Sequence, residues 1–349
     1  MASLPLLVER DWNLGAVVHS TQLHLDESGE QQLRPSQHPV AHWPADQNRK
    51  KLVGALAVSG TTILGVVDDG SQPMAIHDTA RPSQSQGPLL LRGPKRRPVI
   101  LPVGPSVVVV MDRLLRPGAS CRFEALRSDG GATWRADDDP LPEPPLAYDD
   151  EEEDDGEEID YPVITSYFAT GGRRLWISVT FRGTFSLDVE EKTWRLEGEQ
   201  ELPLLERGIS APDLGGAVVL GVSSDGGDAA PSGRRCCAVC ALDVGVRPPA
   251  LLRVWHLPAE RPEEVAFGEM VSLAYLGNGR ICVARSIEVE LSKDVTTPSL
   301  KGRGTSFTVA DVTREDPDGE LRLVSTAKAH RHVWPLGHLG HAVFLQPLA

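Results

Sequence analysis

Short runs of branched apolar residues recur along the chain, and each run follows a glycine by two or three residues. The clearest example is LWISV at residues 175–179, which follows Gly172. The six glycines are Gly60, Gly104, Gly172, Gly216, Gly279 and Gly340, at intervals of 44, 68, 44, 63 and 61 residues. Runs rich in valine and isoleucine favour strands, and glycine suits the turn before a strand because it tolerates positive φ. The pattern predicts a repeated unit of short strands.

Two further strand signals follow the first within several units. The second signal ends in an aspartate in four units, at Asp78, Asp188, Asp243 and Asp311. An aspartate at a strand end can accept hydrogen bonds from the backbone of the following turn. The third signal carries a large apolar residue, as at Trp134, Trp194, Trp255 and Leu323. Units of roughly 40–50 residues with about four strands each are typical of propeller blades. We predict an all-β fold, a six-bladed β-propeller that occupies residues 1–349 as a single domain.

The two ends of the chain indicate how such a ring would close. The last repeat ends four residues after Leu345, which leaves room for only two strands. Residues 1–14 are interpreted as a tail, but residues 15–25 have strand character and precede the first full repeat. We therefore predict that these N-terminal strands complete the C-terminal blade, which would remove two exposed sheet edges.

Residues 140–160 interrupt the repeat with a proline-rich run and then an acidic run. Ten acidic residues lie between positions 149 and 160, and they carry most of the net charge of −14. Dense like charge and low hydrophobicity predict a disordered insert, with weak attraction to a basic partner as the functional alternative. An acidic chain lacks the basic surface that nucleic acid requires, so we expect no nucleic-acid partner.

The termini and the cysteines favour a protein of a reducing compartment. We find neither a signal peptide nor an apolar run near the ~20 residues that span a bilayer. The five cysteines are irregularly spaced. We expect a cytoplasmic or nuclear monomer that does not associate with membranes.

Two groups of metal-ligand residue types were weighed and set aside. The first is Cys236, Cys237 and Cys240, which could form half of a zinc site, but Cys121 and Cys282 stand alone. Small buried side chains are the favoured interpretation of these cysteines. The second group is His330, His332, His338 and His341. No acidic residue lies close enough in sequence to orient these rings, so surface or turn histidines are favoured. We predict no metal and no cofactor.

Residues 129–134, DGGATW, resemble the core of the Asp-box turn of sialidase-like propellers. That turn is structural and lies away from catalytic centres. Sialidase chemistry would need three arginines and a tyrosine–glutamate pair, and no such set can be assembled around Tyr148, Tyr161, Tyr167 and Tyr275. No catalytic residue is predicted.

The unit around residues 160–245 resembles a set of uncharacterised cereal proteins with kelch-like or F-box-associated β-propellers. The resemblance rests on residues 175–179, 183–188, 194–198 and 201–204. It implies a plant protein with a kelch-like propeller. The paired glycines of a standard kelch blade are mostly missing here, and no F-box helix bundle precedes residue 15.

Two classes of function remain open. The first is a non-catalytic protein–protein interaction module, with an adaptor as one form of it, whose partner the sequence does not name. The second is a hydrolase or lyase with a site at the mouth of the central channel. The predicted innermost strands begin with apolar or small residues, which favours the interaction module.

Overall fold

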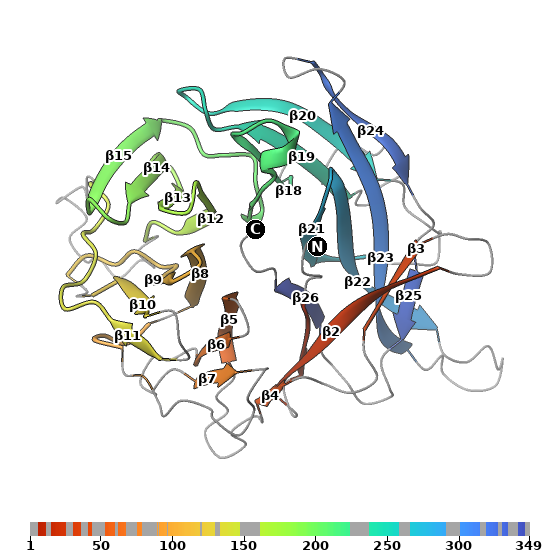
Figure 1. Ribbon diagram of the computed structural model, residues 1–349, viewed down its shortest axis with the longest axis horizontal. Coiled ribbons are helices and arrows are strands. Elements are labelled where there is room, and N and C mark those ends of the chain that lie inside the picture. The colour runs from red at the N-terminus through yellow and green to blue at the C-terminus, as the bar shows by residue number, and fades with distance from the viewer. Residues whose placement is uncertain are drawn as a thin grey trace, which may run out of the picture.

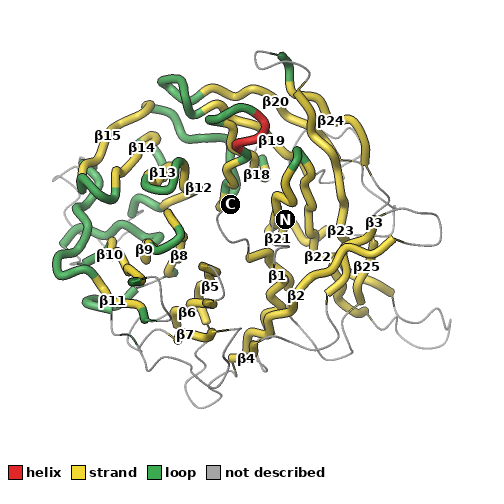
Figure 2. Tube along the Cα trace, viewed as in Figure 1, coloured by secondary structure: helices red, strands yellow, loops and turns green. Residues whose placement is uncertain are grey.

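The structure is a computed structural model of the 349-residue chain. It describes residues 6–11, 15–25, 31–35, 41–43, 53–59, 62–67, 75–78, 89, 91–95, 97–118, 121–129, 133–146, 161–223, 237–257, 266–290, 301–314, 319–326, 330–333 and 341–345. Figure 2 shows that strands and loops make up almost all of this part, with one short helix, η2 (Pro212–Leu214), among the described residues.

Four sheets are complete blades of four consecutive antiparallel strands. The first contains β8 (Pro98–Gly104), β9 (Val107–Asp112), β10 (Phe123–Ser128) and β11 (Trp134–Ala136). The second contains β12 (Ile164–Thr170), β13 (Arg174–Val179), β14 (Gly183–Asp188) and β15 (Thr193–Gly198), and β16 (Glu206–Arg207) pairs in parallel with β12. The third contains β17 (Ile209–Ser210), β18 (Val218–Val222), β19 (Cys237–Asp243) and β20 (Ala250–Leu257). The fourth contains β21 (Ala266–Gly277), β22 (Arg280–Glu290), β23 (Lys301–Arg314) and β24 (Leu321–Thr326), and β25 (His330–Val333) pairs with β23.

Two further sheets depart from this plan. One has three described strands, β5 (Val53–Ser59), β6 (Thr62–Val67) and β7 (Ala75–Asp78). The other joins the two ends of the chain in the order β26 (His341–Leu345), β1 (Leu6–Asp11), β2 (Gly15–Leu25) and β3 (Gln31–Pro35), and β4 (Ala41–Trp43) pairs with β2. Figure 1 shows the sheets set around a common centre, with β8 and β12 nearer to it than β11 and β15.

The predicted all-β propeller arrangement is confirmed, but the count of six blades needs correction, because four of the sheets are complete blades. The prediction for the closing strands is confirmed for the sheet, which contains both residues 15–25 and β26, and is corrected for the order of its strands. The strand that pairs with β26 is β1, with Val8 opposite Val343. Residues 15–25 form β2 and pair with β1 instead. Residues 6–11, interpreted from the sequence as part of a tail, form β1, because strand pairing uses backbone groups that every residue carries.

Apolar cores fill the spaces between neighbouring blades. All six residues of β9 are buried, because both faces of its sheet are covered by other sheets. One core joins the β8–β11 and β12–β15 blades, where the rings of Phe123 and Trp194 meet edge to face at 5.5 Å. The next joins the β12–β15 and β17–β20 blades, where Phe168 and Trp176 stack at 5.6 Å. The unbroken valine run at residues 107–110 is explained by this two-sided burial.

The glycine and aspartate signals have the predicted local roles at some positions: Gly172, Gly216 and Gly279 have positive φ, whereas Gly104 does not. Gly279 lies in the β21–β22 turn with φ at 76°, and a Cβ there would come within 1.9 Å of the Val312 carbonyl oxygen. At the end of β14, Asp188 Oδ1 accepts hydrogen bonds from the backbone N–H groups of Glu190 and Glu191, at 3.2 and 3.1 Å. Single glycine and aspartate residues in the sequence therefore predict these turns.

The proline-rich part of the predicted insert packs against two blades. Leu141 is buried, and its N–H donates to the Phe123 carbonyl oxygen at 3.0 Å. The Trp194 indole N–H donates to the Pro142 carbonyl oxygen at 2.8 Å. The prediction of disorder is therefore wrong for residues 140–146, because their apolar side chains and carbonyl groups find partners on β10 and β15. Residues 147–160 lie outside the described residues.

Candidate binding groove between two blades

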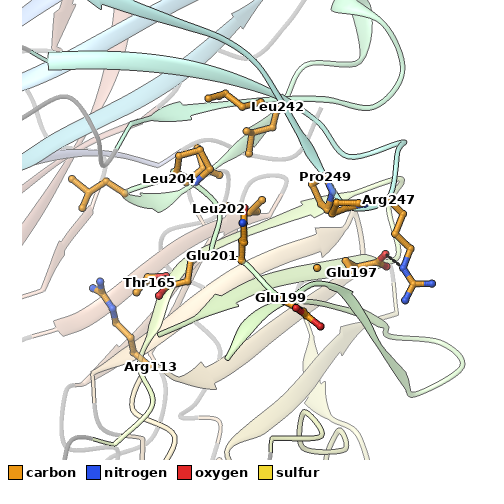
Figure 3. Close-up of a pocket in the computed structure, with 16 residues that line it drawn as sticks. Arg113, Thr165, Glu197, Glu199, Glu201, Leu202, Leu204, Leu242, Arg247 and Pro249 are labelled. Atoms are coloured by element: carbon orange, nitrogen blue, oxygen red, sulfur yellow. Dashed lines mark hydrogen bonds and ion pairs between the residues drawn. The ribbon is translucent and has the colours of Figure 1, made fainter. Parts of the chain in front are cut away.

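A groove of about 1130 Å³ lies between the β12–β15 blade and the β17–β20 blade (Figure 3). Residues 199–205, here called the crossover, connect β15 to β16 and form much of its wall. Leu202 and Leu204 of the crossover and Leu242 of β19 are buried apolar residues of this wall. Arg247 and Leu251, from the loop and strand after β19, form another part of it.

Buried hydroxyl groups attach the crossover to its blade. Ser178 and Thr184 lie opposite each other on β13 and β14, and their hydroxyl oxygens are 2.8 Å apart. Ser178 Oγ accepts a hydrogen bond from the Leu202 N–H at 3.0 Å, and the Thr184 hydroxyl donates to the Gln200 carbonyl oxygen at 2.7 Å. Buried polar groups that are fully paired hold a segment in one conformation. The wall of the groove is therefore preformed.

Glu201 connects the crossover to the neighbouring β13–β14 hairpin. Its Oε2 accepts a hydrogen bond from the Thr165 hydroxyl at 3.1 Å, and its Oε1 accepts one from the Phe181 N–H at 3.0 Å. Phe181 forms the tip of that hairpin, with φ at 58° and 88% of its surface exposed. Because Glu201 lines the groove, this hydrogen bond places the hairpin tip at the edge of the groove.

An ion pair marks the far rim. Glu197 is buried, and its Oε1 accepts a hydrogen bond from the Ser186 hydroxyl at 2.5 Å. Its Oε2 lies 3.8 Å from Arg247 Nε and 3.5 Å from Arg195 Nε. Figure 3 shows the Arg247 guanidinium facing Glu197. Arg247 also donates to the Leu196 carbonyl oxygen, so this rim is tied to the outer strand β15.

Glu199 is exposed and lines the groove. Its carboxylate has no hydrogen bond or ion pair with any described residue. Arg113, across the groove, donates from Nε to the Ile164 carbonyl oxygen at 3.0 Å and pairs with Glu206 at 2.7 Å. The Glu199 carboxylate thus remains available to a ligand, whereas Glu197 and Glu201 are engaged in holding the loops.

Exposed apolar side chains lie on two strands that flank the groove, β15 and β20. Leu196 on β15 is 40% exposed, and Leu251 on β20 is 49% exposed. Exposed large apolar residues that gather beside a groove, flanked by charged residues, are typical of binding surfaces. The arrangement offers apolar contact and one carboxylate, which suits recognition of a ligand.

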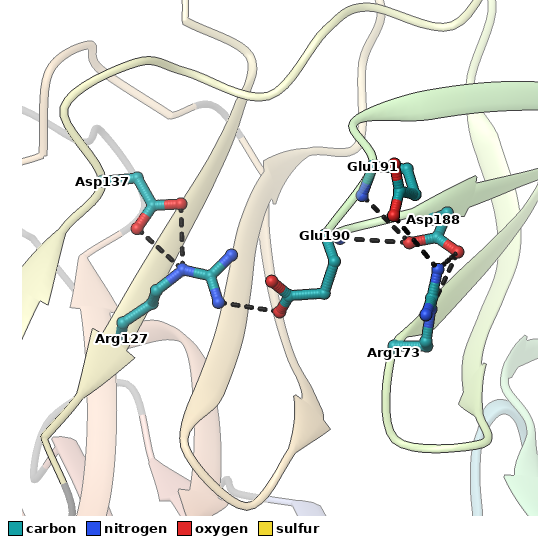
Figure 4. Close-up of polar contacts among 6 residues, drawn as sticks. All are labelled: Arg127, Asp137, Arg173, Asp188, Glu190 and Glu191. Atoms are coloured by element: carbon teal, nitrogen blue, oxygen red, sulfur yellow. Dashed lines mark hydrogen bonds and ion pairs between the residues drawn. The ribbon is translucent and has the colours of Figure 1, made fainter.

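A second charged cluster joins two blades and does not line the groove (Figure 4). Arg127 of β10 donates from Nε to both oxygens of Asp137, at 3.0 and 3.1 Å, and from Nη1 to Glu190 at 2.8 Å. The hydrogen bond to Glu190, which acts against burial, raises the pKa of Arg127. Glu190 lies in the β14–β15 turn of the neighbouring blade, so this cluster has a structural role.

The residues weighed as metal ligands are dispersed or lie outside the described part. Cys240 is buried, with its Sγ 3.5 Å from the Pro203 carbonyl oxygen, and Cys121 and Cys282 are free thiols. Burial raises the pKa of Cys282. The side chains of Cys236 and Cys237, and those of the four histidines, are outside the described residues. Within the described ranges, no group of three or more His, Cys, Asp or Glu residues could hold a metal ion.

The Asp-box-like residues occupy the predicted hairpin. They connect β10 to β11, and Trp134 is buried as expected. The three residues at positions 130–132 lie outside the described part of the chain.

Sequence reasoning missed the groove because four separate segments build it. Arg113, Thr165, Glu199 and Leu251 are far apart in sequence, and none belongs to a recognisable motif. The alternation of Glu197, Glu199 and Glu201 before an apolar run was the one local signal.

Three solved structures resemble the chain weakly. Sqt1 of Saccharomyces cerevisiae is 9% identical, covers 85% of this chain and 96% of its own, and has a TM-score of 0.36. AztD of Citrobacter koseri is 10% identical with 98% of both chains covered and a TM-score of 0.37. The N-terminal domain of Nup159 is 11% identical, covers 99% of this chain and 90% of its own, and has a TM-score of 0.33. These scores are too low to say anything about function.

No curated protein matches the sequence. No helix among the described residues is long and apolar enough to cross a membrane. A family model described as "Protein of unknown function (DUF1668)" matches residues 18–332, and the chain therefore belongs to that family.

Proposed function

We propose that this chain is a non-catalytic protein–protein interaction module and that a partner protein binds in the groove between the β12–β15 and β17–β20 blades. The observation that carries this proposal is the groove itself. It combines a preformed wall, buried leucines, exposed apolar residues such as Leu251, and the carboxylate of Glu199, which has no partner among the described residues. Interfaces use this combination of apolar contact and a few oriented polar groups.

The charged groups of the groove support binding over hydrolysis or lyase chemistry. A general acid or base needs a carboxylate that is free to reach a substrate proton. Both oxygens of Glu201 accept hydrogen bonds that position loops, and Glu197 faces Ser186 and Arg247. Glu199 alone is not a catalytic set, because such chemistry requires converging groups with different roles.

We also propose that the sheets close into one ring, as a single domain over residues 1–349. The supporting contacts are those of β26, which contacts both β21 and β5 while it pairs with β1. Such a ring would leave few exposed sheet edges. A kelch-like adaptor role remains a prediction from the resemblance to cereal propellers.

A comparative pull-down from cell extract tests the proposed function. Wild-type protein, Leu251→Asp in the groove and Val324→Asp on β24 serve as baits. Val324 is 63% exposed and does not line the groove. Val324→Asp is therefore the control, because it introduces the same charge as Leu251→Asp at an exposed apolar position outside the groove. We expect the same partner with wild type and Val324→Asp and its loss with Leu251→Asp. Equal retention by all three baits would contradict the assignment to the groove.

A further inference from the structure

We propose that the segment bound in the groove carries a lysine or arginine next to an apolar residue, and that Glu199 and the ring of Phe181 receive the cation. This inference rests on the proposed function and specifies the chemistry of the partner. Three features carry it: the conformation of Phe181, the rigid support of its hairpin, and the position of the Glu199 carboxylate.

Phe181 has an unfavourable backbone conformation, and its side chain is too exposed for packing to offset that strain. Its φ is 58°, in the left-handed region where a bulky residue is strained by about 1–3 kcal/mol. Its side chain is 88% exposed, the largest value among the exposed large apolar residues that are described. The fold therefore gains little from the ring. An aromatic residue held exposed and strained at a groove edge is suited to contact with a partner.

The hairpin that presents Phe181 is fixed from two sides. Glu201 accepts the Phe181 N–H, and the neighbouring Thr180 hydroxyl donates to the Val163 carbonyl oxygen at 2.9 Å. The Arg182 N–H donates to the Val179 carbonyl oxygen at 3.0 Å. An anchor that is already ordered loses little conformational entropy on binding, which raises affinity.

Glu199 lies against the base of the same hairpin. A Cβ built on Gly183 would come within 2.4 Å of the Gly198 carbonyl oxygen and 3.0 Å of Glu199 Cα, so the two segments are in direct contact. Phe181 precedes Gly183 by two residues, so a basic segment laid across this contact would be offered the Glu199 carboxylate, which has no partner among the described residues, and an exposed aromatic ring, two groups that both attract positive charge.

The charge of the surroundings agrees with a basic ligand. Three glutamates line the groove, at positions 197, 199 and 201, against two arginines. Such a field attracts basic segments and repels acidic ones. Beside the cation, the exposed Leu251 and the buried leucines of the wall provide the contact for an apolar side chain.

A phage-displayed library of random dodecapeptides, selected on the full-length protein, tests the inference. Selection is repeated on Glu199→Lys, Leu251→Asp and Glu191→Lys. Glu191 has a 70% exposed side chain and does not line the groove, so it controls for the change in net charge. We expect peptides with a lysine or arginine beside an apolar residue on wild type and Glu191→Lys. We expect both groove variants to lose them.

One enriched peptide, labelled with fluorescein, then reports affinity by anisotropy. Glu199→Lys should weaken binding at least about tenfold, and so should Phe181→Gly, because truncation of an anchor residue typically has this effect. Phe181→Gly should keep or raise the thermal midpoint, since glycine accepts the positive φ. A purely structural role for Phe181 would instead lower the midpoint and leave the affinity unchanged, which overturns the inference.

The outcomes separate the two proposals. Peptides without basic residues that depend on Leu251 would leave the groove as the binding site and overturn the inference about the cation. If no selected peptide distinguishes the groove variants from wild type, both the inference and the assignment of binding to the groove are overturned.

Discussion

A buried ion pair connects the β8–β11 blade to the segment that precedes it, and removal of one of its two charges should be strongly destabilising. Lys95 has no exposed surface, and its Nζ pairs with Glu124 Oε1 on β10. The ammonium group also donates to the carbonyl oxygens of Gly93, at 3.2 Å, and Cys121, at 2.6 Å. Glu124 in turn accepts from the Arg92 N–H at 2.8 Å, so one carboxylate organises the whole segment.

Glu124→Leu removes this carboxylate and leaves the Lys95 ammonium buried without its counter-charge. Breaking a buried ion pair from one side typically destabilises a protein by about 3–5 kcal/mol. That is a large part of the roughly 5–15 kcal/mol by which a domain is stable. We expect a loss of this size in the free energy of unfolding, measured by urea denaturation with tryptophan fluorescence.

The double variant Lys95→Met/Glu124→Leu isolates the effect of charge. With both charges removed, no buried ion remains, and the loss of stability should be about 2 kcal/mol smaller than in Glu124→Leu. Backbone groups that used the pair remain unsatisfied, so the double variant should stay below wild type. If the double variant loses as much as the two single variants combined, the buried charge is not the cause and the reasoning is refuted.

Three further predictions concern turns and pH. Burial acts to raise the pKa of Asp188, but hydrogen bonds from Arg173 and the following turn outweigh it and leave the pKa lowered. The stabilisation from the ionised carboxylate is thus present above pH about 4 and is lost as the pH falls through the folded-state pKa. In urea denaturation at a series of pH values, the free energy of unfolding of Asp188→Asn should therefore fall less steeply with acid than that of wild type. In the structure the buried Gly279 N–H donates to the Tyr275 hydroxyl oxygen at 2.8 Å. Tyr275→Phe removes this acceptor and should lower the free energy of unfolding by about 1–3 kcal/mol. Gly279→Ala should lose at least about 1–3 kcal/mol in the same assay, since φ is 76° and the Val312 carbonyl oxygen blocks the new Cβ; an unchanged midpoint would contradict the turn geometry.

The sequence by itself determined the local chemistry of the blades. The valine run at residues 107–110 predicted a strand, and β9 forms there. Gly172 and Gly279 were assigned to turns, and both have positive φ. Asp188 was assigned to the end of a strand, and it caps the following turn. Each of these features depends on one residue and its immediate neighbours, which is why pattern alone suffices.

Only the tertiary structure decided how distant segments meet. The pairing of β1 with β26 joins residues at opposite ends of the chain through backbone hydrogen bonds, which leave no mark on side-chain pattern. Residues 140–146 look like part of a proline-rich, disordered insert, yet Leu141 and Pro142 are held by Phe123 and Trp194 of two different blades. The groove depends in the same way on segments that only folding brings together. The carboxylate of Glu199, unpaired within the described part of the chain, stands out only once the partners of the other charged groups are known.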